Sequence, residues 1–213
     1  VDAVGMNIVP PAAPATDVPV CAAGQPVADL FTDDLEVTDD GRWTYQQSPG
    51  AYRWGYQSES LFSYATSGDQ GFYGPTTGTT ADRSVVMSAA VALPLGSHPV
   101  LHFRHAYGFE SGSGSNWDGG VIEYSTTGLG GPWLDLGPMI EENGYDGSLA
   151  PGGSNPIKGR PAFVDESQGY LSSRVDLSLL VGEDVRIRFR VGEDSVVGDY
   201  GWFIDDVRVA DCP

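Results

Sequence analysis

The chain has 213 residues, 40% of them hydrophobic, and its 29 acidic against 11 basic residues give a formal net charge of −18 at pH 7. This length fits one well-buried domain, and such acidity argues against nucleic acid or an anionic membrane as a partner, because phosphate binding needs a basic face. No apolar run reaches the ~18 residues of a transmembrane helix, so we expect no membrane insertion.

Residues 1–20 differ in composition from the rest of the chain. The run PPAAPA at residues 10–15 is typical of a semi-rigid extended linker. Ahead of it, VDAV at residues 1–4 echoes IDDV at residues 204–207. We interpret residues 1–20 as a linker or as the tail of a preceding module, and the echo leaves tandem repetition of one module open.

The two cysteines, Cys21 and Cys212, bracket residues 21–213, which we predict to form one domain. A disulfide between them would close a very long loop, worth ~4–5 kcal/mol in the chain-entropy model, and would indicate an oxidising, extracellular setting. Two unpaired thiols are the alternative. The cysteine spacing does not fit a zinc knuckle.

Strand patterns dominate from Cys21 onward. The clearest is DVRIRFRV at residues 184–191, where Val185, Ile187 and Phe189 alternate with arginines. Strict alternation indicates a strand with one buried and one solvent-exposed face, as in antiparallel sheets. We predict an all-β, antiparallel two-sheet β-sandwich, with strands over residues 84–93, 100–107, 119–126, 170–177, 184–191 and 198–209. A long Gly-rich connection, residues 141–169, is expected to carry function or to need an ion.

Several motifs resemble those of one family. They are HFRHAYGFE at residues 102–110, WDGGVIEYST at 117–126, SNPIKGRPAFV at 154–164 and GWFIDDVRV at 201–209. Together they resemble the jelly-roll module of secreted bacterial proteins, as appended to metallopeptidases of the immune-inhibitor-A kind. That module is similar in plan to MAM domains and to the cleaved-adhesin modules of gingipains. The resemblance covers about residues 84–209 and implies a non-catalytic sandwich of jelly-roll type, often holding calcium.

Adjacent aspartates interrupt the last predicted strand. Neighbouring side chains on a strand face opposite sides, so Asp205 should share the core-facing side of Val207. A buried carboxylate needs a partner, and three stay open: an arginine, the backbone N–H groups of a turn, or calcium. Jelly-roll sugar-binding modules, which this chain resembles, share one calcium between a first-strand carboxylate and a last-strand aspartate. We therefore predict Asp205 and Glu36 as calcium ligands, Asp34 next, and Asp206 as an outer acceptor.

Two further acidic groups are candidates. Glu110 and Asp118 flank a short Gly/Ser loop that offers carbonyl oxygens for calcium, although Asp118 could instead hold a structural turn. Glu193, Asp194 and Asp199 form the third group, which we interpret as a surface loop.

Catalysis is not expected. His102 and His105 are three apart on a strand and therefore point to opposite faces, which rules out a shared metal. His105 is expected to be a hydrogen-bonded core histidine. The sequence contains neither HExxH nor GxSxG, and no Gly-rich phosphate loop.

Aromatic residues could form a ligand platform. The candidates are Trp43, Trp54, Tyr56 and Trp117. The alternative is that the tryptophans plug the ends of the sandwich. Taken together, these observations predict a non-catalytic, calcium-stabilised accessory or adhesion-like binding module of a larger secreted or cell-surface bacterial protein. Two alternatives are a carbohydrate-binding module of an extracellular enzyme and a structural module that associates with neighbouring copies. The partner would be a glycan, a protein surface or another copy.

Overall fold

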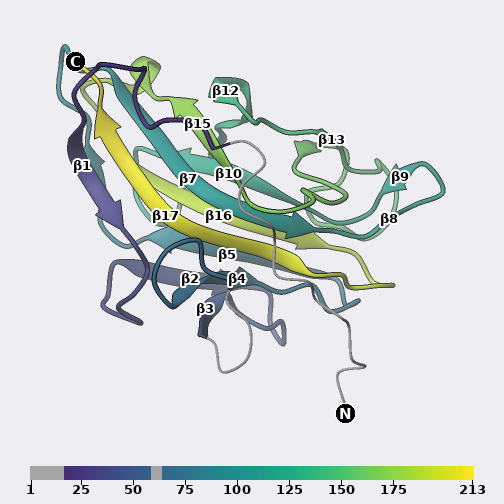
Figure 1. Ribbon diagram of the computed structural model, residues 1–213. Coiled ribbons are helices and arrows are strands. Elements are labelled where there is room, and N and C mark those ends of the chain that lie inside the picture. The colour runs from purple at the N-terminus through teal and green to yellow at the C-terminus, as the bar shows by residue number, and fades with distance from the viewer. Residues whose placement is uncertain (1–16, 59–63) are drawn as a thin grey trace.

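The structure is a computed structural model, which describes residues 17–58 and 64–213. Two large antiparallel sheets pack face to face (Figure 1). The first is ordered β12 (Ile140–Glu142), β15 (Leu171–Asp176), β7 (Pro99–Gly108), β17 (Gly201–Asp211), β4 (Gln70–Gly74) and β3 (Gly55–Ser58), and β1 (Ala28–Asp33) also pairs with β17. The second is ordered β11 (Leu134–Asp135), β10 (Gly119–Ser125), β16 (Asp184–Glu193), β5 (Ala81–Met87) and β2 (Trp43–Gln47), and β6 (Val91–Ala92) pairs with β16. This arrangement confirms the predicted all-β, antiparallel two-sheet sandwich.

Short elements complete the fold. They are two small hairpins, β8 (Ser111–Gly112) with β9 (Ser115–Asn116) and β13 (Gly147–Ser148) with β14 (Pro161–Ala162), and two 3-10 turns, η1 (Gly137–Met139) and η2 (Ser178–Leu180). No helix in the described ranges is long and apolar enough to cross a membrane.

The alternating segments become strands close to their predicted bounds, with one exception. The stretch at residues 84–93 is divided between β5 and β6 by a bend at residues 88–89. The connection at residues 141–169 folds over the outer face of β10, where Val121 packs with apolar residues of that connection in a small separate core: Leu149, Ile157, Ala162 and Val164. Apolar packing therefore stabilises this long segment.

The main core lies between the sheets and is rich in aromatic rings. Within it, Trp202 Nε1 donates to His105 Nδ1 at 3.1 Å. Because Nδ1 of His105 accepts this bond, Nε2 of the imidazole carries the hydrogen and donates to Ser173 Oγ at 2.8 Å. His105 is fully buried, which confirms it as a hydrogen-bonded core histidine. His102, on the opposite face of β7, donates from Nε2 to the carbonyl oxygen of Val18 at 2.9 Å.

Residues 17–20, which we call the strap, lie across the outer face of β7 and β15. The backbone N–H of Val18 donates to Ser172 Oγ at 2.7 Å, and Asp17 pairs with Arg104 at 2.7 Å. Arg174 donates to the carbonyl oxygen of Pro19 at 3.3 Å. The strap leads into Cys21, which is bonded to Cys212 with 5.5 Å between the two Cα atoms. The predicted disulfide is thus present, while the VDAV echo lies outside the described residues.

Removing the disulfide should destabilise the domain strongly. The bridge spans 191 residues, and the chain-entropy model assigns about 5 kcal/mol to a loop of that length. We expect the double variant Cys21→Ser/Cys212→Ser to lose about 2–5 kcal/mol of unfolding free energy, as measured by urea denaturation. A loss below about 0.5 kcal/mol would show that the strap and β17 stay together without the bridge.

Burial should keep His105 neutral in acid. Desolvation lowers the pKa of this imidazole from 6.5 to about 3. Because the unfolded state binds a proton that the folded state refuses, His105 reduces stability progressively as pH falls below 6.5. We expect long-range ¹H–¹⁵N NMR spectra to show a neutral ring protonated at Nε2 from pH 7 to 4. A titration midpoint near 6.5 would contradict the buried hydrogen-bonded arrangement.

Candidate metal centre and ligand surfaces

A β-bulge accommodates the paired aspartates in β17. The register against β7 shifts between Asp205 and Arg208, and Asp206 has a φ of +49°. Ile204 and Val207 consequently both lie in the core. The expectation that Asp205 shares the face of Val207 is wrong, because the extra residue of the bulge breaks the alternation.

The buried carboxylate of Asp205 is bound by a turn. Its Oδ2 accepts from the backbone N–H groups of Thr66 at 2.6 Å and Ser67 at 3.1 Å, and from the Thr66 hydroxyl at 2.9 Å. Its Oδ1 accepts from the N–H of Asp206 at 2.8 Å. Backbone N–H groups, one of the three partners that the sequence left open, therefore bind this carboxylate. Burial, followed by repulsion from Asp206, still raises the pKa of Asp205.

Glu36 holds the other end of the same turn. Its carboxylate accepts from the N–H groups of Asp69 and Gln70, each at 3.0 Å. Between Ser67 and Asp69 the turn requires Gly68, because its φ is +56° and a Cβ there would lie 2.3 Å from the Glu36 carboxylate. Asp34 accepts from the N–H of Glu36 at 3.3 Å. Among the described residues, these carboxylates do not form a metal-ligand cluster with Asp205 or Asp206.

The second predicted pair does form such a cluster. Glu110 and Asp118 lie in a group with Asp194. Each of the three residues offers one carboxylate oxygen, and these oxygens all lie within 4.8 Å of one another. Asp118 is fully buried, and its Oδ1 accepts from the N–H of Asp194 at 2.8 Å. In the described part of the chain, Asp118 Oδ2 and Glu110 Oε2 are buried without a hydrogen-bond donor.

The electrostatics of this acidic trio favour a cation. Burial and the neighbouring carboxylates raise the pKa of Asp118 to about 8. Burial, followed by repulsion from the Asp194 carboxylate, raises the pKa of Glu110. Three converging carboxylates with two oxygens unsatisfied are the hard donors that Ca²⁺ selects, with backbone carbonyls or water completing six to eight ligands. The residues present therefore fit a calcium ion.

Sequence reasoning missed Asp194, which was assigned to a surface loop with Glu193 and Asp199. Asp194 is 6% exposed, and Glu193 is fully buried in an ion pair with Arg83 at 2.7 Å. β16 extends to Glu193, in phase with the buried alternate positions before it. Extending the alternation from Val191 by two residues predicts that Glu193 is buried, and this would have indicated that the next residue, Asp194, lies near the end of β16 and not in a surface loop.

The aromatic candidates are mostly in the core. Trp54 is fully buried and Trp43 is 6% exposed, so neither ring presents a face to a ligand. Both belong to the main core, whereas the alternative to a ligand platform placed the tryptophans at the ends of the sandwich. Tyr56 is half-buried against Phe72, with 4.9 Å between ring centroids. Trp117 is half-buried and lies beside the loop of the acidic trio.

No protein-family model and no curated protein matches the chain. Among solved structures, the K1 cleaved adhesin domain of Lys-gingipain from Porphyromonas gingivalis is similar, with a TM-score of 0.53 and 15% identity over 84% of this chain and 96% of that one. The K3 cleaved adhesin domain of the same protein gives a TM-score of 0.47 and 15% identity over 85% and 98%. A xylan-binding domain from Paenibacillus barcinonensis gives 0.47 and 12% over 89% and 98%. The likeness to the K1 domain shows a shared β-sandwich fold.

Proposed function

We propose that the chain is a non-catalytic, calcium-stabilised binding module of a larger extracellular protein, and that it binds a glycan or a protein surface. The observation that carries the calcium part is the trio of Glu110, which is half-buried, with the buried Asp118 and Asp194, in which two buried oxygens lack hydrogen-bond donors in the described residues. The Cys21–Cys212 disulfide supports an oxidising compartment.

The placement of the histidines supports a binding role over catalysis. His105 is committed to the core, His102 holds the strap, and His98 is exposed on the turn before β7. In the ranges that the structure describes, no hydrogen bond joins any of the three to a carboxylate through its ring. The sandwich fold shared with an adhesin domain supports the same role.

Calcium should stabilise the protein through the trio. At one hundred times its dissociation constant, a ligand adds about 2.7 kcal/mol, which raises the unfolding midpoint of a domain of this size by about 5–10 °C. We expect this rise for the wild type between excess chelator and millimolar calcium. Asp118→Asn should abolish the response, and in chelator at pH 8 this variant should be at least as stable as the wild type, because it removes a buried charge.

Asp205→Asn is the matched control. It should lower the midpoint equally with and without calcium, because Asp205 is bound by backbone N–H groups. The reverse result, in which Asp205→Asn loses the calcium response and Asp118→Asn keeps it, would place the ion between the first and last strands. No calcium response in the wild type would refute calcium stabilisation.

The binding role predicts retention without turnover. We expect the calcium-loaded chain to be retarded in native gels that contain a neutral polysaccharide, such as xylan, mannan or galactan, and to release no reducing ends from it. Release of reducing ends would show that the chain is an enzyme. Absence of retardation, together with no capture by extracellular-matrix proteins, would refute a glycan or protein ligand.

A further inference from the structure

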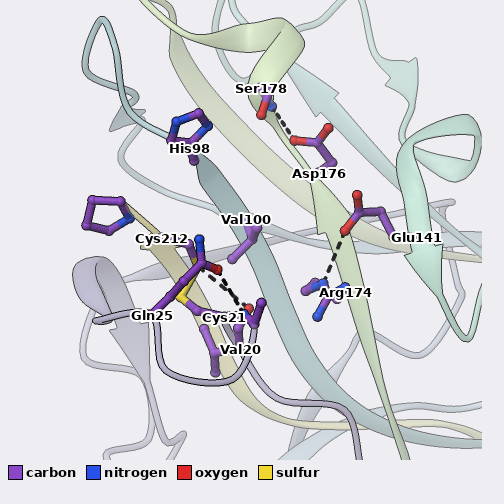
Figure 2. Close-up of a pocket in the computed structure, with 12 residues that line it drawn as sticks. Val20, Cys21, Gln25, His98, Val100, Glu141, Arg174, Asp176, Ser178 and Cys212 are labelled. Atoms are coloured by element: carbon purple, nitrogen blue, oxygen red, sulfur yellow. Dashed lines mark hydrogen bonds and ion pairs between the residues drawn. A yellow bond between two sulfur atoms is a disulfide. The ribbon is translucent and has the colours of Figure 1, made fainter.

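An open cavity of about 330 Å³ lies beside the disulfide, on the outer face of the first sheet (Figure 2). The end of the strap and the following turn form one wall, and residues from β12 and β15 form the other. Small-molecule sites start at about 300 Å³, so the cavity has room for a ligand of small size.

The floor of the cavity is apolar. Val20, Val100 and the Cys21–Cys212 disulfide line it, and both half-cystines are at most 6% exposed. The floor is held in place by the backbone, because the N–H of Cys212 donates to the carbonyl oxygen of His98 at 3.0 Å. It offers a small patch against which C–H groups of a ligand can pack.

The rim carries polar groups whose positions are already fixed. Gln25 accepts the N–H of Ala22 at 3.1 Å through Oε1, which leaves its Nε2 donors without a partner among the described residues. Asp176 uses Oδ1 to accept the N–H of Ser178 at 2.8 Å, which leaves Oδ2. The ring of His98 makes no hydrogen bond within the described ranges, whereas the backbone N–H of His98 donates to Asp211 Oδ1 at 2.7 Å. The rim therefore offers both hydrogen-bond donors and acceptors.

Arg174 closes the rim opposite His98. It contacts Glu141 at 3.2 Å and also donates to the strap. Figure 2 shows Gln25 and His98 on one side of the cavity, and Arg174, Glu141 and Asp176 on the other. Among the described residues that line the cavity, Arg174 is the one arginine, and it is already paired with Glu141. Because Asp176 adds a second carboxylate, the rim disfavours anionic ligands.

A pyranose has the chemistry that this cavity presents. Each sugar hydroxyl both donates and accepts a hydrogen bond, and these hydroxyls surround an apolar C–H face. An acidic sugar would meet the carboxylates of the rim and a protein of net charge −18. We infer that the cavity binds one neutral sugar residue of a glycan, with the strap as one wall. This inference rests on the proposed function and deepens it.

The test measures sugar binding by the full chain in calcium, using ¹H–¹⁵N correlation spectra and calorimetry. The probes are short oligomers of xylose, mannose, galactose and glucose, with galacturonic acid as the anionic comparison. Gln25→Glu keeps the acceptor that holds Ala22 but replaces the free donor, and His98→Ala removes an exposed ring. Gln47→Glu makes the same charge change on an exposed residue of β2, away from the cavity.

We expect at least one neutral oligomer to bind and to shift the signals of Gln25, His98 and Arg174, while galacturonic acid does not. Gln25→Glu and His98→Ala should each weaken that binding about tenfold or more, and Gln47→Glu should not. If the two cavity variants bind like the wild type, the sugar lies elsewhere and the inference fails while the proposed function stands. If no oligomer binds the wild type, the inference also fails, and the proposed function fails with it only when the polysaccharide and matrix-protein tests are negative as well.

Discussion

The bulge at Asp205 and Asp206 is the constraint on which the first sheet depends. Before it, residues 202–204 of β17 pair with β4, and after it, residues 207–211 pair with β1. One edge of a single strand is thus shared by two partners in succession. At the junction neither partner continues the ladder, and the Asp205 carboxylate binds the turn that leads into β4. The bulge lets the first and fourth strands lie end to end along the last one.

The way in which buried carboxylates are satisfied separates structural charges from the candidate ion site. Glu193 has Arg83 and the N–H groups of a turn, and Asp205 has N–H groups and the hydroxyl of Thr66. Glu123, 2% exposed, accepts from three arginines: Arg160, Arg188 and Arg190. In the described part of the chain, only the acidic trio gathers three carboxylates, and no salt bridge to an arginine involves them. A cation from solution would supply the charge that arginines supply elsewhere.

The sequence allowed the fold to be predicted where one face of a strand is uniformly apolar. β7, β15 and β16 follow this alternation, and the pattern fixes which face is buried. β1 to β4 were not predicted, because aromatic and polar residues there do not alternate and pairing to distant strands decides their conformation.

The candidate site was half predicted for a related reason. Glu110 and Asp118 are close in sequence and bracket one hairpin, so local spacing indicates them. Asp194 follows β16, which is distant in the sequence, and it lies beside Asp118 because β10 pairs with β16. The bulge that places Asp205 and Val207 on different faces could not be predicted from composition, because an extra residue in a strand leaves no mark on its apolar pattern until Val207.

The disulfide also determines how the domain bears force. Because Cys21 and Cys212 are joined covalently, a pull applied at the two cysteines passes through one sulfur–sulfur bond and bypasses both sheets. The 191-residue separation between them, roughly 650 Å of extended chain, cannot be drawn out while that bond is intact. Under tension the domain behaves as a short inextensible link, and neither its core nor any ligand held against the disulfide is disturbed by load along that line.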